Sequence, residues 1–122
     1  MPFSLTLVAD GIRCRYTRDV TQLDVAEAVA KIGSELDTRN IRFVIHDFCA
    51  ADSLESGISA QLTFALKFRG KVSVGTLQRM AVVTREDVLS YLVEELKKHS
   101  AHQTQVFKSL AEAEHWVRNR TD

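Results

Sequence analysis

Hydrophobic and polar positions alternate along most of the first seventeen residues. Phe3 to Val8 alternates, Asp10-Gly11 follows shortly after, and Ile12 to Thr17 alternates again. Alternation of this kind is typical of half-buried strands, and Asp-Gly is a preferred hairpin turn. The pattern therefore predicts an antiparallel hairpin, which we expect at an edge of a sheet.

A continuous apolar run identifies the predicted centre of that sheet. Ile41 to Ile45 is interrupted only by Arg42, and such a strand is usually buried on both faces. Residues 79 to 83 form the next buried strand, and residues 105 to 107 a short last one. In adjacent parallel strands we expect four buried residues: Val44, Ile45, Ala81 and Val83.

Four further stretches carry apolar residues at helical spacing, and each begins at a capping residue with an acid three positions later. The pairs are Thr21 with Asp24, Asp52 with Glu55, Thr84 with Asp87, and Ser109 with Glu112. A hydroxyl or carboxylate at this position accepts a hydrogen bond from a free backbone N–H of the first turn. The pairs predict four helices, of which the first runs to about residue 36 and the second from 52 to about 68.

The predicted order of elements is ββαβαβαβα, which indicates an α/β fold. Strands that alternate with helices imply right-handed crossovers and a mainly parallel sheet, here with an antiparallel N-terminal edge hairpin. The chain has 122 residues, is 45% hydrophobic, and shows no linker or low-complexity segment. We therefore expect residues 1–122 to form a single domain.

Charge and composition narrow the classes of function. Sixteen basic and sixteen acidic residues cancel, which argues against nucleic acid or an anionic membrane surface as the partner. The sequence has neither a signal-peptide pattern nor 18 consecutive apolar residues, so we expect a cytoplasmic protein without a membrane span. Cys14 and Cys49 lack metal-ligand spacing and are expected to be small core residues.

The candidate site follows the central strand, at residues 47 to 57. In open α/β sheets, ligands and partners meet the protein beyond the carboxyl ends of the strands. Asp47 ends the strand, and Ser53 and Ser56 fall in the first turn of the predicted helix, where the helix dipole favours a phosphate. The alternative is a structural role: Asp47 would accept hydrogen bonds from nearby loop N–H groups, while Ser53 and Glu55 would cap the helix.

Catalytic and metal-binding chemistry is not indicated. His46 adjoins Asp47, but neighbours in a strand point to opposite faces, so we expect a core histidine. His99, His102 and His115 have no metal-ligand spacing, and no GxGxxG, GxxxxGK[ST], GxSxG or HExxH motif is present. We expect no metal, no cofactor and no enzymatic activity.

Several of these stretches together resemble the SpoIIAA-like, or STAS, superfamily. They are the short hairpin, the strand ending in DF, the helix start containing SG, the strand RMAVV and the closing VFKSLAEAEHWV. The resemblance covers nearly the whole chain and is closest to uncharacterised bacterial SpoIIAA-like, STAS/SEC14-like proteins. In that branch a phrase of the form VF-x-SLxEAxxW is typical, and residues 106 to 116 fit it.

The resemblance also implies a site. In anti-sigma-factor antagonists of the superfamily, the central strand ends in D-[LF]-S, and a following D-S-S-G segment carries a serine that a partner kinase phosphorylates. Here Asp47-Phe48-Cys49 has Cys49 in place of the serine, and Glu55-Ser56-Gly57 places Ser56 at the phosphorylated position with a spacing one residue shorter. The candidate partner or phosphate site is therefore Asp47, Ser53, Glu55, Ser56 and Gly57.

The function that the sequence favours is a regulatory or protein–protein interaction module. The alternative is a carrier or sensor for a small apolar or anionic ligand near the carboxyl ends of the strands, as the SEC14-like comparison implies. A carrier would need a concave pocket of a few hundred cubic ångströms with a few polar groups.

The predicted helix at residues 54–68 has a second apolar line besides its main stripe. Gly57, Ala60, Phe64 and Phe68 follow one another at spacings of three, four and four. Two phenylalanines in water would form a patch of the kind that marks an interface, which predicts a homodimer through Ala60, Phe64 and Phe68. The alternative is that the 69 to 78 loop covers both rings.

Phe64→Glu combined with Phe68→Glu should yield a folded monomer. Burial of each phenylalanine contributes roughly 1.5–3 kcal/mol per subunit, which two carboxylates would remove. Light scattering alongside circular dichroism measures both properties. A wild type that is monomeric at high micromolar concentration, or a double variant that unfolds, would support the covered-ring alternative.

Overall fold

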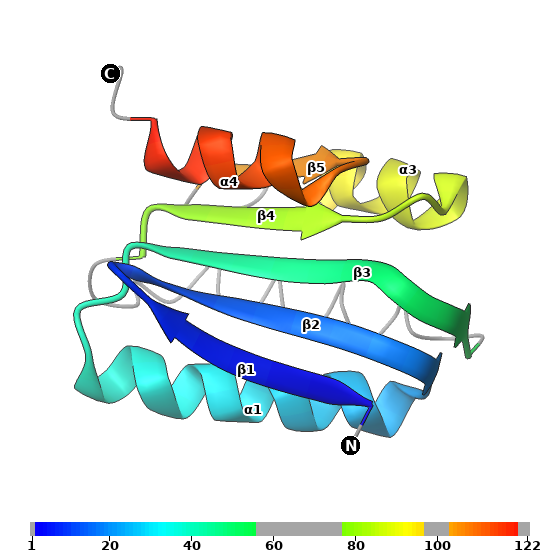
Figure 1. Ribbon diagram of the computed structural model, residues 1–122, viewed down its shortest axis with the longest axis horizontal. Coiled ribbons are helices and arrows are strands. Elements are labelled where there is room, and N and C mark those ends of the chain that lie inside the picture. Colours follow the sequence, from blue (N-terminus) through cyan, green and yellow to red (C-terminus); the bar gives the residue numbers. More distant parts are fainter. Residues whose placement is uncertain (1, 56–76, 97–102, 120–122) are drawn as a thin grey trace.

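The computed structural model describes residues 2–55, 77–96 and 103–119, and their strands form one five-stranded sheet (Figure 1). The strands are β1 (Phe3–Val8), β2 (Gly11–Val20), β3 (Phe43–Leu54), β4 (Arg79–Val83) and β5 (Gln103–Phe107). They lie in sequence order across the sheet; β1 pairs with β2 antiparallel and all other pairs are parallel. The predicted edge hairpin and the central position of β3 are both confirmed.

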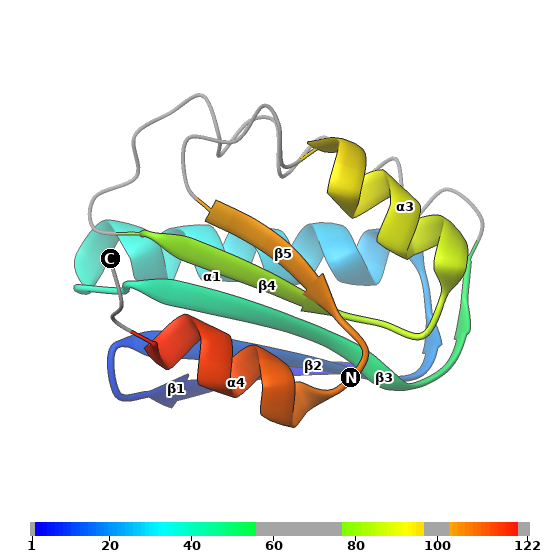
Figure 2. The same cartoon turned by 90° about the horizontal axis from the view of Figure 1, so that it is seen from above.

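Helices cover both faces of the sheet (Figure 2). They are α1 (Gln22–Thr38), α3 (Asp87–Leu96) and α4 (Leu110–Arg118). On one face α1 and α3 bury a core that includes Ile12, Val44 and Val82, with Val25 and Val93 from the helices. On the other face α4 covers a smaller core. Its buried members are Phe43, Ile45, Ala81, Val83, Ala113 and Val117.

The four residues that the sequence placed in adjacent buried strands do lie there. Val44, Ile45, Ala81 and Val83 are each fully buried, and Ile45 is opposite Ala81 in the parallel pair of β3 with β4. Successive residues of β3 alternate between the two cores because side chains of a strand point to opposite faces. This double burial explains why the strand reads as an unbroken apolar run.

Two of the predicted caps are present as hydrogen bonds. The Thr21 hydroxyl accepts from the backbone N–H of Asp24 at 3.2 Å, and the Thr21 N–H donates to the Asp24 carboxylate at 2.8 Å. Ser109 accepts from the N–H of Glu112 at 3.2 Å at the start of α4. Thr84 differs, since its hydroxyl accepts from the N–H of Glu86 and so holds the turn before α3.

The predicted helix start at Asp52 is wrong. β3 continues through Leu54 because β2 also runs further than expected, to Val20, and the two strands stay paired up to Val20 with Leu54. Pairing along the whole of β2 outweighs the local capping preference of Asp52. The remainder of the predicted 54–68 helix, including Ala60, Phe64 and Phe68, lies outside the described residues.

Gly11 is required where β2 passes under the aromatic ring of Phe43. A Cβ at Gly11 would lie 2.3 Å from two carbons of that ring, closer than side-chain atoms ever approach. On the other side, the Arg118 guanidinium of α4 lies 5.2 Å from the ring centroid. Only a residue without a side chain therefore lets the ring lie flat between β2 and α4.

A stack of rings fills the core beneath β2 and β3. Tyr16 lies parallel to Phe48 with centroids 4.2 Å apart, and its hydroxyl lies 3.0 Å from Nδ1 of His46. Burial raises the pKa of Tyr16 well above its ordinary value and lowers the pKa of His46 from 6.5 to about 4. Both groups are therefore neutral, and one hydrogen bond between the hydroxyl and the ring nitrogen satisfies two polar groups inside the core. His46 is the core histidine that the sequence predicted.

Stability should fall as the pH falls from 6.5 towards 4. In the unfolded chain His46 takes up a proton near pH 6.5, whereas the folded chain resists protonation until about pH 4. The unfolded state therefore binds more protons in this window, and the accumulated loss is about 3 kcal/mol. Urea unfolding at pH 7 and at pH 4.5 measures it.

The matched variants are His46→Gln and His115→Gln, since His115 is exposed on α4. The first should flatten the dependence on pH and the second should leave it unchanged. An NMR titration of the wild type gives a second measurement. Protonation of the His46 ring above pH 6 would contradict the assignment.

Candidate functional site

The strands end at different heights, and this stagger forms the candidate site. β4 ends at Val83 opposite Asp47, whereas β3 continues to Leu54. Thr84, the first residue after β4, donates its N–H to the carbonyl oxygen of Phe107 at the end of β5, at a distance of 2.9 Å. The carboxyl-end mouth, as we name it, consists of Asp47, Cys49, Thr84, Arg85 and Lys108.

Asp47 is buried and lies opposite Val83, the last residue of β4. Its Oδ1 accepts a hydrogen bond from the backbone N–H of Cys49 at 3.0 Å, two residues further along β3. Asp47 therefore satisfies a backbone donor next to the end of β4, which is the structural alternative that the sequence left open. The same carboxylate places a negative charge beside the Cys49 thiol.

Cys49 lies between charges of opposite sign. Its Sγ is 3.8 Å from the carbonyl oxygen of Lys108, and it is half-buried against the core under α4. Burial raises the pKa of the Cys49 thiol, the Asp47 carboxylate raises it further, and the Arg85 guanidinium opposes both. The thiol stays protonated, and a protonated thiol is a poor nucleophile.

Ser53 and Glu55 lie away from the mouth and form hydrogen bonds to β2 and to the start of α1. The Ser53 hydroxyl donates to the Asp19 carboxylate at 2.6 Å, and Glu55 accepts from the Gln22 N–H at 3.1 Å at the start of α1. Six positions of extended strand separate Ser53 from Asp47, which is about 20 Å. The structure therefore does not bring these residues together, and Ser56 and Gly57 lie outside the described residues.

Arg85 and Lys108 were missed in the sequence. Arg85 lies two residues after the end of β4 and Lys108 one residue after the end of β5, and the ends of parallel strands meet at one edge of a sheet. That rule was applied to the central strand alone, and its use on all three parallel strands would have found both cations. Across the described ranges, no group of three His, Cys, Asp or Glu side chains could hold a metal ion.

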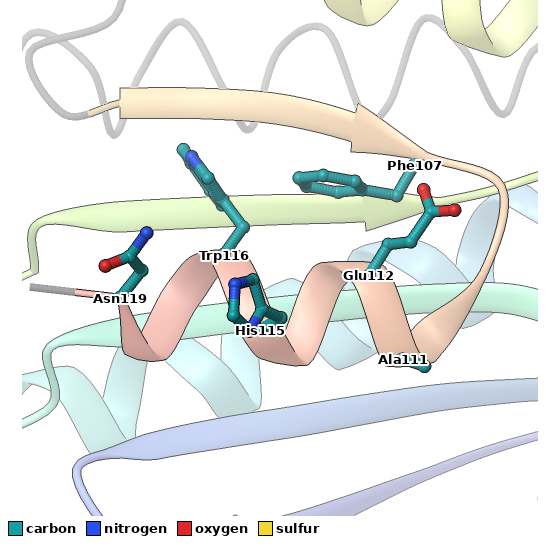
Figure 3. Close-up of a pocket in the computed structure, with 6 residues that line it drawn as sticks. All are labelled: Phe107, Ala111, Glu112, His115, Trp116 and Asn119. Atoms are coloured by element: carbon teal, nitrogen blue, oxygen red, sulfur yellow. The ribbon is translucent and has the colours of Figure 1, made fainter. Parts of the chain in front are cut away.

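A hollow of about 490 Å³ lies along α4 rather than at the carboxyl-end mouth (Figure 3). Phe107 and five residues of α4 and its end line it. Phe107 at the carboxyl end of β5 is the one lining residue that a strand supplies. None of the described helices is both long and apolar enough to cross a membrane.

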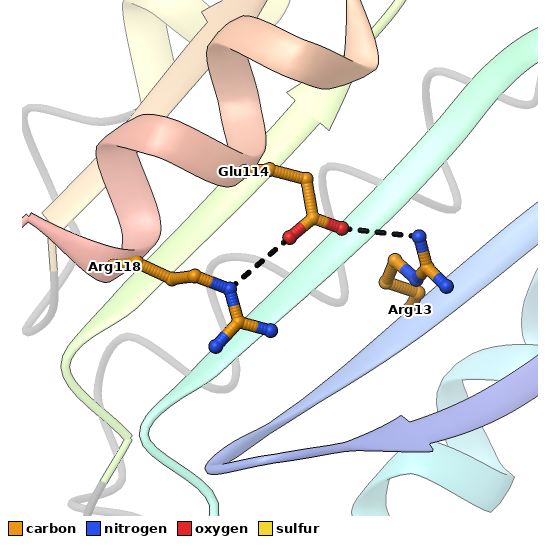
Figure 4. A network of polar contacts seen from close by, with 3 residues as sticks. All are labelled: Arg13, Glu114 and Arg118. Atoms are coloured by element: carbon orange, nitrogen blue, oxygen red, sulfur yellow. Dashed lines mark hydrogen bonds and ion pairs between the residues drawn. The ribbon is translucent and has the colours of Figure 1, made fainter.

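Ion pairs tie the opposite side of α4 to β2 (Figure 4). Glu114 accepts from Arg13 at 3.2 Å and from Arg118 at 3.3 Å, so one carboxylate serves two guanidinium groups. All three side chains are a quarter or more exposed, and such pairs contribute at most about 1 kcal/mol each. Their role is to orient α4, whose attachment comes from its buried face.

The architecture defines the class of this protein as an α/β domain with a SpoIIAA-like fold. The anti-sigma factor antagonist SpoIIAA in its unphosphorylated form superimposes with a TM-score of 0.69 at 14% identity, covering 96% of this chain and 98% of that one. The phosphorylated form of SpoIIAA, a Bacillus cell fate determinant, gives a TM-score of 0.65 at 14% identity, covering 95% and 99%.

An uncharacterized protein of the DUF3478 family from Shewanella loihica PV-4 has the same SpoIIAA-like fold. Its TM-score is 0.62 at 13% identity, with coverage of 94% of this chain and 91% of that one. No protein-family model and no curated protein matches the sequence. The SpoIIAA-like fold expected from the resemblance is thus confirmed, and at these identities the likeness establishes the fold alone.

Asp47→Asn should make Cys49 react faster with iodoacetamide at pH 7.5. The variant removes the negative charge that raises the pKa of the thiol, while the amide oxygen can still accept from the Cys49 N–H. We expect a rise of a few-fold in the alkylation rate, measured by mass spectrometry of the folded protein.

Arg85→Gln is the matched variant of opposite sign, because loss of its positive charge should slow the reaction. Cys14 is fully buried and should remain unmodified in all three proteins. Equal rates for the wild type and both variants would show that these charges do not act on the thiol.

Proposed function

We propose that this protein is a non-catalytic regulatory module that binds a protein partner at the carboxyl-end mouth. The observation that carries the proposal is the stagger at β4, where Asp47 and Cys49 lie beside the Arg85 guanidinium and the Lys108 backbone from two neighbouring strand ends. Charged groups fixed by a rigid sheet give a partner both orientation and specificity. The protonated thiol argues for recognition rather than chemistry at this point.

The similar structures support a regulatory role. SpoIIAA is described as an anti-sigma factor antagonist, with both a phosphorylated and an unphosphorylated form. Phosphorylation of Ser56 in this chain stays a prediction from the resemblance, as does a homodimer through the 54–68 segment. The proposal for the mouth depends on neither, because it uses only Asp47, Cys49, Arg85 and Lys108.

Arg85 and Lys108 would supply the long-range attraction. Arg85 is exposed at the end of β4, and Lys108 follows the end of β5. An acidic patch on the partner would approach these cations, whereas Asp47 is buried and would act through the Cys49 N–H that it orients. Loss of one exposed interface charge lowers the association rate, and reversal of its sign adds repulsion.

A photo-crosslinking amino acid at position 85 or 108 should capture the same partner in a lysate of the source cells. The matched control is position 27 on α1, where an exposed glutamate lies on the opposite face of the sheet. Mass spectrometry identifies the captured protein, which is then purified and titrated against the wild type and Arg85→Glu.

We expect Arg85→Glu to weaken binding at least tenfold with an unchanged circular dichroism spectrum. The salt dependence of the affinity should also decrease, because one charged contact is removed. Capture from position 27 but from neither mouth position, or an unchanged affinity of Arg85→Glu, would contradict the proposal.

A further inference from the structure

The hollow along α4 is built from aromatic rings and one carboxylate (Figure 3). Its volume of about 490 Å³ lies within the range of small-molecule sites. The lining residues are Phe107, Ala111, Glu112, His115, Trp116 and Asn119. Phe107 ends β5, and the others are on or directly after α4, so two rigid elements fix the shape of the hollow.

Phe107 and Trp116 form its apolar wall. Their ring centroids are 5.5 Å apart and the planes are inclined by 48°, so the two rings present faces at an angle rather than stacking flat. Both side chains are only half-buried. The face of an aromatic ring carries partial negative charge and attracts a cation, most strongly for tryptophan.

Glu112 supplies the charge. Its carboxylate lies beside the Phe107 ring, and the side chain is exposed and forms no ion pair among the described residues (Figure 3). Capping of α4 uses the Glu112 backbone N–H and leaves the carboxylate available. A carboxylate at the Phe107 end of a hollow that also contains the Trp116 ring is complementary to a positive group.

The Arg79 guanidinium already lies over the Trp116 ring, but its hydrogen bonds are made to the end of α4 and to Gln103. Its carbon Cζ is 5.0 Å from the ring centroid, while its N–H groups donate to the carbonyl oxygens of Trp116 and Asn119 at the end of α4. A third donation reaches Gln103 at 3.1 Å. The negative end of the helix dipole thus balances Arg79, and Glu112 is left as the unbalanced charge of the hollow.

We propose that this hollow binds a compact organic cation through its trimethylammonium or similar alkylammonium group. Such a group is apolar on its surface and positive overall, which matches two ring faces and a carboxylate. A carboxylate in this position opposes an anionic ligand. The site is separate from the carboxyl-end mouth, so its failure would leave the proposed regulatory function untouched.

Trp116 is the single tryptophan of the chain, so intrinsic fluorescence reports directly on the hollow. Choline is the probe, and 3,3-dimethylbutan-1-ol, which has the same shape without the charge, is the matched control ligand. Titrations are run at pH 8 and constant ionic strength. We expect a saturable change with choline, and at least tenfold weaker binding of the alcohol.

Glu112→Gln should weaken choline binding at least threefold, and Phe107→Leu should weaken it as well. Glu27→Gln is the matched control, since it removes an exposed carboxylate from α1 on the other face of the sheet and should change nothing. Circular dichroism verifies folding, and Glu112→Gln alters only an exposed side chain. A further arm with N-acetyl-trimethyllysine amide distinguishes a protein side chain from a free small molecule as the source of the group.

Three results would overturn the inference. The first is equal binding of choline and the alcohol, and the second is an equal effect of Glu112→Gln and Glu27→Gln. The third is the absence of any saturable change, both in fluorescence and in the NMR signal of the Trp116 indole N–H, with choline and with the trimethyllysine compound.

Discussion

The parallel pairing of β2 with β3 is the interaction on which the rest of the structure depends. It runs from Gly11 opposite Phe43 to Val20 opposite Leu54, longer than any other pair in the described sheet. Along its length it aligns Tyr16 with His46 in the core, and at its end it brings Glu55 to the first turn of α1. The two cores, the buried polar pair and the start of α1 therefore all depend on this one pairing, whose register shifts between Arg15 and Thr17 and again between Arg18 and Asp19.

The pairing of β2 with β3 also forms the carboxyl-end mouth, because it continues beyond the point where β4 ends. Beyond the end of β4, β3 keeps β2 as its neighbour and stays extended, and among the described residues no strand pairs with its other side there. At this point the Asp47 carboxylate accepts a hydrogen bond from the Cys49 N–H. A side chain that satisfies the backbone where β4 ends also holds a buried charge beside Cys49, so the structural role of Asp47 and its proposed role in recognition depend on one contact.

The sequence predicted those features that depend on local chemistry or on burial of both strand faces. The apolar run at residues 41 to 45, the Thr21–Asp24 capping box and the hairpin signal at Asp10-Gly11 are all local. The strand, the capping box and the hairpin are present, although β3 begins at Phe43 and the turn is at residues 9 and 10, with Gly11 already in β2. The helix start at Asp52 failed because its capping pattern is local, while the competing β2–β3 pairing joins residues far apart in the chain. No local pattern carries that information.

The candidate site was predictable to the same extent. Asp47 was selected because it closely follows the apolar run at residues 41 to 45, and Ser53 and Glu55 were selected because of the mistaken helix start. Arg85 lies near Cys49 because β4 pairs with β3, and the Lys108 carbonyl oxygen does so because β5 pairs with β4. The hollow along α4 needed the angle between two rings, which only side-chain packing determines.

The parallel centre of the sheet also bears on how the chain folds. The β1–β2 hairpin joins neighbours in sequence and can close within microseconds, whereas each parallel pair must first close a long loop that contains a crossover. Closing each loop costs conformational entropy before the strand contacts that offset this cost have formed. Until β3 arrives, β2 presents an unpaired edge and an apolar face to solvent, and the nascent chain is then most open to pairing with another copy of itself.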